Sequence, residues 1–387
     1  MAKQQSEAFE RYMLSVIEDR REGRFEDALR GLLRGLSYVF AGIVQLRLWL
    51  YEIGMLRYHT LGCQVLSVGN LTVGGTGKTP VVEVFARLLA ANGRKVAILS
   101  RGYKREKQPK TWKQKLGFGK KDDEPPAVVT DGERLLLGSA KSGDEPYMLA
   151  RNLAGVAVIV GSDRVKSGRY AIKKLGCDTL ILDDGFQHLR LKHRLDIVLV
   201  DATNPFGNGR VLPRGILREP IRNIKRAGFI FISKSRPEGE PELRRLLRSL
   251  NPVAEISECR HSPKYLEDVY SKERRPLEDL RGKRVVAISG IAVPRGFESG
   301  LIHLGADVVH HAIFSDHYRY TNQDIIDVMN YAEEVGADMV MTTEKDAVRF
   351  PLIEQRPLPF VFLRVEIEML SGAEQFNEWI GRICFEG

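Results

Sequence analysis

The sequence has few features of secreted or membrane-spanning proteins. Its 387 residues include only four cysteines, which lie far apart without metal-ligand spacing, so we expect reduced, mostly buried thiols. Residues 1–26 are polar and contain no apolar core segment, which gives no indication of a cleavable signal peptide. The longest charge-free run near the N-terminus contains Gly35–Gln45 and lies between Arg34 and Arg47, which is too short for a bilayer crossing of about 20 apolar residues. No internal repeat or low-complexity segment is present.

The composition is that of a folded protein with room for two domains. Hydrophobic residues make up 43% of the chain and charged residues 28%, which excludes a disordered chain. The formal net charge is +9 and the sequence pI is about 9.3. Such a balance suits an anionic partner, which could be a nucleotide, a nucleic acid, a phospholipid surface or a phosphorylated substrate.

A glycine-rich segment after an apolar run carries the strongest functional signal. The run Val65–Val68 is typical of a buried strand, and Pro80 is tolerated where the predicted helix Val81–Leu89 begins. Backbone N–H groups of such a loop can converge on a polyphosphate, with the lysine on the β- and γ-phosphates and the threonine on Mg²⁺. The predicted phosphate-binding residues are Thr72, Val73, Gly74, Gly75, Thr76, Gly77, Lys78 and Thr79.

This loop departs from the strict phosphate-binding pattern at one position. The pattern has glycine six residues before the lysine, and Thr72 stands there instead. The alternative is a glycine-rich turn with a surface lysine, but the order of strand, Gly-Lys-Thr and helix favours phosphate binding. The motif alone does not separate a kinase from an ATPase, a GTPase or a chaperone.

Strands and helices alternate along the chain, which predicts an α/β fold with a phosphate-loop type parallel sheet flanked by helices. A seam at Ser235–Glu240 and a restart of the alternation predict a second, smaller α/β domain. The predicted organisation is a polar extension (1–28), an amphipathic helix (29–60), a phosphate-loop kinase domain (61–236), the smaller domain (237–366) and a C-terminal helix packing back on the kinase domain (367–387). The predicted strands are 65–68, 95–100, 127–130, 156–160, 179–182, 196–200, 228–232, 284–291, 307–314, 339–343 and 360–365.

Two segments outside this alternation have unusual composition. Leu29–Leu56 is rich in large apolar residues interrupted by arginines. It could be an amphipathic helix in a membrane interface, or a helix packed on its own domain or on another subunit; its basic character slightly favours the membrane. Lys104–Lys121 is basic and contains proline and glycine, which predicts a long surface loop.

Two carboxylate pairs are candidates for chemistry at strand ends. Asp183 and Asp184 follow a predicted strand, where phosphate-loop proteins hold Mg²⁺. Asp144 and Glu145 form the second pair, since phosphoryl transfer to a hydroxyl needs a base or an orienting acceptor. His317 is a natural partner for such a base, although spacing alone does not establish the pairing. A downstream basic cluster could bind phosphate, although surface arginines are more often solvated than functional. It comprises Arg210, Arg214, Arg218 and Arg222, with Lys225 and Arg226.

Taken together, these clusters resemble one family, the lipid A 4′-kinases (tetraacyldisaccharide 4′-kinases) of Gram-negative bacteria. The matching stretches occur in the family's order and span most of the chain, and the Asp-Asp-Gly-Phe-Gln-His run is highly specific. The unusual Thr72 is also what the family shows. The stretches are Gly69–Pro80, Ser100–Tyr103, Gly143–Pro146, Asp183–His188, Leu212–Pro220 and Phe314–Tyr318.

The resemblance implies an ATP- and Mg²⁺-dependent kinase of lipid A biosynthesis. Its substrate would be the 4′-hydroxyl of a tetraacyldisaccharide 1-phosphate, and it would be peripheral at the cytoplasmic face of the bacterial inner membrane. We expect a monomer and no nucleic-acid partner. The implied roles are Asp144 as base paired with His317; Lys78 and Thr79 on ATP and Mg²⁺; Asp183 and Glu145 near the metal; and Asp184, Arg164 and Arg218 completing the site, with Arg214 as the alternative to Arg218.

Other activities share parts of this pattern. A nucleotide-switch ATPase at the membrane also has a Gly-Lys-Thr loop, but it has no need of an Asp144–His317 pair, and metal delivery predicts clustered cysteines or histidines that are absent here. A nucleic-acid-binding ATPase would fit the high pI, although the basic residues are spread over the chain rather than gathered in one stripe. A small-molecule kinase is the nearest enzymatic alternative.

Overall fold

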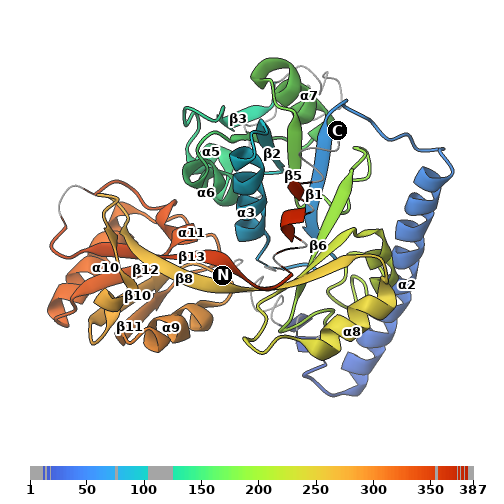
Figure 1. The fold of residues 1–387 in the computed structure, drawn as a ribbon. Helices are drawn as coiled ribbons and strands as arrows, with labels where there is room; N and C mark the ends of the chain where they lie inside the picture. Colours follow the sequence, from blue (N-terminus) through green and yellow to red (C-terminus); the bar gives the residue numbers. More distant parts are fainter. Residues whose placement is uncertain are drawn as a thin grey trace, which may run out of the picture. The chain divides into compact units, whose positions relative to one another are not determined.

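The computed structural model describes residues 12–13, 15–17, 19–74, 77–102, 125–353, 356–372, 374, 376–378 and 380–381. Gly75, Thr76, the predicted loop Lys104–Lys121, and much of both the N-terminal extension and the predicted C-terminal helix lie outside the described residues. The chain divides into two compact units, and each is considered by itself (Figure 1). The first contains residues 1–78, 179–260 and 369–387, and the second contains residues 79–178 and 261–368. The predicted domain boundaries stay a prediction.

The first unit is built on a parallel sheet. Apolar runs rich in β-branched residues form its strands, because both faces of a parallel sheet are covered. The strands pair in the order β5 (Thr179–Asp183), β1 (Gln64–Asn70), β6 (Leu195–Asp201), β7 (Phe229–Ser233) and the start of β8 (Glu255–Asp268). Phe186, Val198, Ile230 and their neighbours form a buried core, which also contacts the short helices η1 (Ile221–Arg226) and α8 (Pro241–Leu250).

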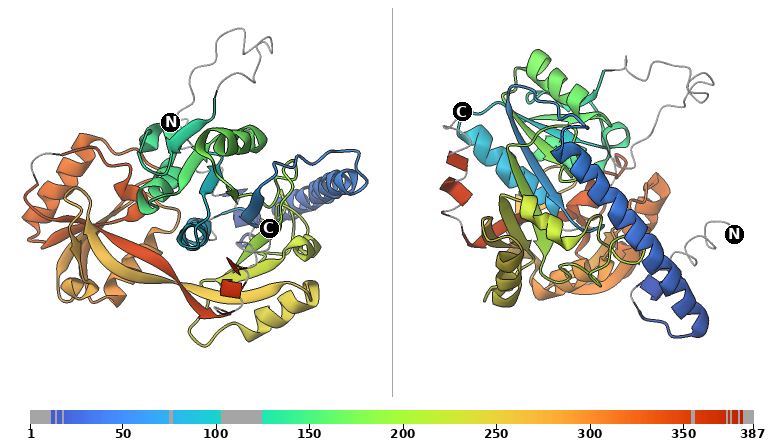
Figure 2. Two further views of the ribbon diagram at one scale, coloured as in Figure 1. Left: turned by 45° about the horizontal axis from the view of Figure 1, so that its top comes forward. Right: turned by 90° about the vertical axis from the view of Figure 1, so that its right-hand side faces the viewer.

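The long helix α2 (Arg24–Glu52) belongs to this unit, and Figure 2 shows it as one continuous helix. It begins five residues before the predicted apolar segment and ends before Leu56. Phe40 and Ala41 pack against the core, and the Ser37 hydroxyl donates to Val211 O at 2.6 Å. A second set of apolar side chains stays exposed; it comprises Leu32, Leu36, Val39, Ile43, Leu46 and Trp49. No helix in the described ranges combines the length and apolar character that a membrane crossing requires.

In the second unit, one strand group follows the phosphate-loop helix. Helix α3 spans Lys78–Ala91, and β2 (Val96–Ser100) pairs in parallel with β4 (Ala157–Val160), which pairs antiparallel with β3 (Ala127–Thr130). Helices α5 (Ser139–Ser142), α6 (Asp144–Asn152) and α7 (Arg164–Leu175) belong here. Asp163 caps α7 by accepting from the N–H groups of Val165 and Lys166.

A second group of strands, paired in parallel with one another, completes the second unit. Its order is β11 (Asp307–Ile313), β10 (Arg284–Ser289), β12 (Met339–Thr343) and β13 (Phe360–Ser371), drawn in orange and red in Figure 1. Alternate residues enter two cores: Val286 and Val340 face one, while Val285 and Met341 face the other. The remaining elements are β9 (Arg274–Arg275), η2 (Leu277–Leu280), α9 (Pro294–His303), α10 (Asn322–Glu334) and α11 (Glu344–Ala347).

Several local predictions are confirmed. Strands β3 and β12 have the predicted bounds, and Thr321 caps α10 in a capping box with Asp324. Cys177 and Cys259 are buried thiols, and burial raises the pKa of Cys177 to about 11 and that of Cys259 to about 12, so both stay protonated.

Candidate active site

Four side chains gather in the first unit at the carboxyl ends of β1 and β5; we call them the Lys78 cluster. Lys78 Nζ donates to Asn70 Oδ1 at 3.1 Å and lies 3.4 Å from Asp184 Oδ1. Arg218 Nη1 lies 2.8 Å from both oxygens of Asp184. Strand pairing places Val68 beside Asp183, so adjacent parallel strands deliver these groups to one edge of the sheet.

The backbone of the Asp183–His188 run explains its glycine and its aromatic residue. Asp184 has a φ of 56°, a left-handed conformation that few residues other than glycine adopt. A Cβ on Gly185 would lie only 2.6 Å from the Leu182 Cβ, so the turn has no room for a side chain there. Phe186 is fully buried against β1, where a Cβ on Gly69 would lie only 2.7 Å from the Phe186 Cβ. Gln187 then donates to Asn70 O at 3.0 Å, which ties this turn to the end of β1.

Electrostatics keep Asp184 ionised. Burial raises the pKa of Asp184, but the charges of Lys78 and Arg218, together with their hydrogen bonds, outweigh it and hold the pKa below its usual value. The cluster is therefore a carboxylate between two cations. A phosphate group could take over the cations, because guanidinium and ammonium groups bind phosphate as readily as carboxylate.

The structure separates the two arginines that the sequence left as alternatives. Arg218 belongs to the Lys78 cluster, whereas Arg214 Nη2 lies 2.6 and 2.8 Å from the oxygens of Asp19. Arg214 also donates to Ile17 O at 2.7 Å. Arg214 therefore attaches part of the N-terminal extension to the first unit, a function that sequence reasoning did not assign to the extension.

The loop that carries Arg218 is hydrogen-bonded to the start of the phosphate-binding loop. Val73 N donates to Ile216 O and Arg218 N donates to Leu71 O, each at 2.7 Å. Thr72 forms a β-bridge with Leu217. The position where the strict motif has glycine is thus an extended residue in a small ladder, which explains why a threonine is accommodated there.

A second group of side chains, in the second unit, surrounds Asp144 at the start of α6; we call it the Asp144 cluster. Asp144 Oδ2 lies 2.9 Å from His317 Nδ1, the contact that the pairing prediction requires. Arg349 Nε lies 3.6 Å from the same oxygen, and Arg319 Nη2 lies 3.6 Å from Oδ1. The Asp144 side chain is only 5% exposed. With the proton on Nδ1, His317 donates to the carboxylate and orients it.

The charged groups that face Asp144 are cationic. Burial raises the pKa of Asp144, but the hydrogen bond from His317 and the charges of Arg349 and Arg319 outweigh it and hold the pKa below its usual value. His317 has a φ of 62°, so this cluster also contains a residue in the left-handed region. Such conformations gather at functional sites, because the surrounding structure must hold them in place.

The other predicted side chains are divided between the two units, and each has its own local contacts. Glu145 Oε1 lies 3.2 Å from Lys345 Nζ, and Arg164 Nη1 donates to Gly161 O at 2.7 Å. Thr79 is buried in the first turn of α3, and Asp183, in the first unit, ends β5. The described part of the chain holds no cluster of three or more His, Cys, Asp or Glu suited to a metal ion. The Thr79 hydroxyl and the Asp183 and Glu145 carboxylates are each oxygen donors of the kind that Mg²⁺ takes, and Mg²⁺ usually binds one or two protein carboxylates and substrate phosphates.

Sequence reasoning missed several neighbours of the key residues. Asn70 was quoted within a motif without a role, and Arg319 was not singled out. Arg349 follows the predicted strand 339–343 by six residues, and only this nearness to a strand end points to it.

A family model described as LpxK, tetraacyldisaccharide-1-P 4′-kinase, matches residues 29–384. The chain belongs to this family. The curated tetraacyldisaccharide 4′-kinase of Anaeromyxobacter sp. (strain K) is 44% identical to this kinase over 340 residues, 87% of this chain and 85% of the relative. That of Halothermothrix orenii is 37% identical over 353 residues, 88% of each.

The fold comparison agrees with the family match. The crystal structure of the "apo" form of LpxK from Aquifex aeolicus in complex with ATP is 30% identical, with a TM-score of 0.72, and the match covers 92% of this kinase and all of that chain. The resemblance, the α/β phosphate-loop fold and the assignment as a phosphotransferase are thereby confirmed. The family match begins at residue 29, so the polar extension lies outside it.

Proposed function

We propose that this kinase transfers the γ-phosphate of ATP to the 4′-hydroxyl of a tetraacyldisaccharide 1-phosphate, with Asp144 as the base. The observation that carries the proposal is the 2.9 Å contact between Asp144 Oδ2 and His317 Nδ1 in a buried, cationic setting. A switch ATPase has no use for such a pair. The Aquifex relative was crystallised with ATP, which supports ATP as the phosphate donor.

The Lys78 cluster supplies the phosphate side of the reaction. Lys78 and the backbone of residues 72–79 would bind the β- and γ-phosphates, and Lys78 would exchange Asp184 for phosphate oxygens. Thr79 and Asp183 would hold Mg²⁺, with Glu145 near it; the ion supplies neutralisation of phosphate charge. Arg218 and Arg164 complete the site as donors to phosphate oxygens, and Asp184 orients Lys78 and Arg218.

The Asp144 cluster would bind and activate the sugar hydroxyl that accepts the phosphate. The low pKa keeps Asp144 ionised at neutral pH, so it is ready to accept the hydroxyl proton. Among the described residues, Oδ1 of Asp144 accepts no hydrogen bond, which leaves it acceptor capacity. The Arg319 side chain beside this oxygen is 41% exposed, so its displacement would open Oδ1 to a sugar hydroxyl. His317 holds the other oxygen, and a loose transition state lets proton transfer come late.

The exposed apolar side chains of α2 would hold the kinase at the cytoplasmic face of the inner membrane. Trp49, Tyr38 and the arginines of this helix suit the headgroup region and anionic lipid. We propose a peripheral monomer without a nucleic-acid partner. Replacing Val39 and Ile43 by glutamate should release the protein from anionic vesicles in flotation, because both side chains are about 60% exposed and apolar. Unchanged flotation would contradict this attachment.

The deciding experiment follows labelled γ-phosphate from ATP to a tetraacyldisaccharide 1-phosphate in detergent micelles. Label should appear on the lipid with the native chain and disappear with Lys78→Ala. Arg214→Gln is the matched control, since it removes a nearby arginine that contacts Asp19 rather than Asp184. ATP hydrolysis without a lipid product would overturn the proposal in favour of a nucleotide-switch ATPase.

A further inference from the structure

Arg349 is a buried arginine that the proposed reaction does not use. It follows α11 closely, and its side chain is 0% exposed. Burying a guanidinium has a large desolvation penalty, and a buried ion pair contributes little to stability compared with apolar residues of similar volume. Its position beside Asp144 therefore calls for an explanation other than stability.

The guanidinium of Arg349 contacts both the turn that carries His317 and the end of the neighbouring strand β10. Nη1 donates to Tyr318 O at 3.0 Å, and Nη2 donates to Gly290 O at 3.1 Å. Gly290 O also accepts from His317 N at 3.0 Å. One side chain thus fixes the residue after His317 and the carbonyl to which the His317 backbone is bonded.

The same guanidinium reaches the proposed base. Nε lies 3.6 Å from Asp144 Oδ2, the oxygen that meets His317. The left-handed φ of His317 is unfavourable for a side chain with a Cβ, so this conformation needs outside support. Arg349 supplies that support and faces the carboxylate at the same time.

Arg349 is itself held rigidly. It forms an ion pair and hydrogen bond with the buried Asp346, and its Nε donates to Lys345 O at 3.1 Å. Asp346 Oδ1 also accepts from Gly290 N at 2.9 Å and from the Tyr320 hydroxyl at 2.8 Å. A Cβ on Gly290 would lie 2.8 Å from that hydroxyl, so the packing leaves no room for adjustment.

We propose that Arg349 is a positioning residue for phosphoryl transfer. From the buried side of the turn that carries His317, it holds Asp144 and His317 in the geometry of their contact. This inference rests on the proposed role of Asp144 as base. The charged groups on the elements around α6 are arranged consistently with it: His317 and Arg319 face Asp144 from the turn after β11, and Lys345 pairs with Glu145. Arg349 is the fully buried cation of this set.

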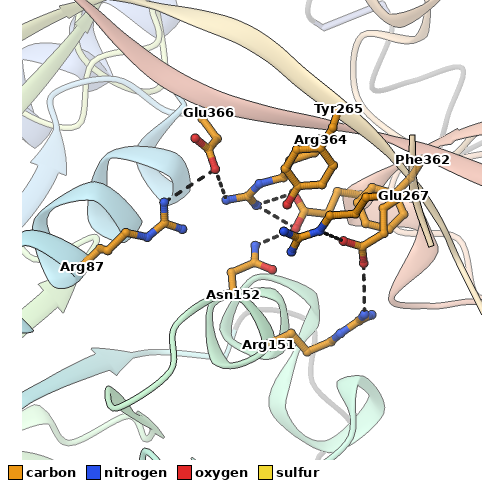
Figure 3. A pocket seen from close by; sticks show the side chains of 10 residues that line it. Arg87, Arg151, Asn152, Tyr265, Glu267, Phe362, Arg364 and Glu366 are labelled. Atoms are coloured by element: carbon orange, nitrogen blue, oxygen red, sulfur yellow. Dashed lines mark hydrogen bonds and ion pairs between the residues drawn. The ribbon is translucent and has the colours of Figure 1, made fainter. Parts of the chain in front are cut away.

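Arg364 offers a matched control. It is also buried and ion-paired, and it lies in the same unit, but its contacts are Glu83, Glu344 and Glu366 rather than the Asp144 cluster. Figure 3 shows it above Asn152 and beside Glu366, within a polar pocket. A change at Arg364 therefore reports what the loss of a buried arginine does to folding alone.

The test is a double-mutant cycle between Arg349→Lys and His317→Ala, read as kcat and KM for lipid transfer. Arg349→Lys keeps the positive charge but loses the planar guanidinium that donates to several carbonyls at once. We therefore expect kcat to fall roughly 10- to 100-fold, because Asp144 and His317 would be misplaced for the reaction. KM should change less than about threefold, since Arg349 would touch neither substrate. In the His317→Ala background the same change should lower kcat by no more than about threefold, because coupled residues are not additive.

Controls separate the possible failures. Arg364→Lys should lower the melting temperature by a similar amount while kcat stays within about threefold of the native value. Should Arg349→Lys not fold, Asp346→Asn tests the same coupling, since it removes the counter-charge of Arg349 and leaves an oxygen for Gly290 N. Additive losses in the cycle overturn the inference alone. Normal turnover of His317→Ala overturns both the proposed Asp144–His317 pair and the inference.

Discussion

Asp184 and Asp144 are two carboxylates with similar neighbours and different settings. Each lies beside cations that lower its pKa, and each cluster contains a residue with left-handed φ, which is Asp184 itself in one and His317 in the other. The Asp184 side chain, however, is 38% exposed, whereas that of Asp144 is 5% exposed. An exposed pair can exchange its partners for a ligand, while a buried one is fixed before the ligand arrives.

The two clusters also differ in how the chain assembles them. Asn70 ends β1 and Asp184 directly follows β5, and these two strands are adjacent and parallel; the Lys78 loop follows β1 directly. The Asp144 cluster joins the start of α6, the turn after β11 and the segment after α11. The first arrangement is local to one sheet edge, and the second depends on how distant elements pack.

The largest expected effect concerns the Lys78 cluster, whose cations can exchange Asp184 for a ligand. Lys78→Ala should lower kcat/KM for ATP by about 10³-fold, because a donor aimed at developing charge is removed. Steady-state transfer kinetics with ATP titration measure it. If Lys78 is only a surface lysine in a glycine-rich turn, kcat/KM will stay within a few-fold of the native value.

The next largest effect concerns the Asp144 cluster, whose contacts are fixed before a ligand binds. Asp144→Asn should lower kcat by at least about 100-fold while ATP affinity stays unchanged, since the acid–base contribution is lost without touching the Lys78 cluster. Transfer kinetics and ATP-binding calorimetry together measure this. Loss of ATP binding in this variant would remove the functional distinction between the clusters.

A smaller effect compares two arginines four residues apart. Arg218→Gln should lower kcat/KM roughly 10-fold, because the Lys78 cluster loses the cation whose Nη1 contacts both oxygens of Asp184. Arg214→Gln should leave kcat/KM unchanged and lower the melting temperature, since Arg214 pairs with Asp19. Reversed results would show that the hydrogen bonds of the structure do not reflect the roles of these residues.

The smallest effect concerns a carboxylate outside both clusters. Burial raises the pKa of Asp201, but hydrogen bonds from Lys234 and Thr203 outweigh it and lower the pKa. A depressed folded-state pKa means that the stabilisation is present above the unfolded-state value, near 4, and is lost as pH falls through the folded-state value.

Asp201→Asn should therefore lower the free energy of unfolding by about 1 kcal/mol at neutral pH. The difference from the native protein should shrink in acid, and urea unfolding between pH 3 and pH 7 measures it. Unchanged kcat is expected, because this pair lies in neither cluster. A difference that grows in acid would contradict the assigned pKa direction.

The contrast between the clusters also explains how far sequence reasoning reached. Apolar runs located β3 and β12 with their bounds, because each strand coincides with a short continuous run of apolar residues in the sequence. Strand β8 was missed, since Glu255–Asp268 mixes charged residues with Pro263 and is only partly buried. The start of α2 at Arg24 was missed because its first turn is polar.

At the site, the sequence motifs identified the residues that lie within them, but they did not identify residues from other segments that pack against them. Lys78, Asp184 and Arg218 lie in recognisable runs, and the structure brings them together. The contact between Asp144 and His317 spans 173 positions, so spacing could only suggest it. Arg349 could not be found, because nothing in a local pattern shows that an arginine is buried under a turn from another segment.

The segment between Thr343 and Arg349 also limits how this family can vary in evolution. Asp346 lies in the short helix α11 and Arg349 shortly after it, so a residue inserted between them would move the guanidinium away from Gly290 and Asp144. Homologues should therefore keep the length of this segment. Epitope tags or fluorescent insertions belong elsewhere in the chain, and a length change in this segment would mark a homologue that has lost this activity.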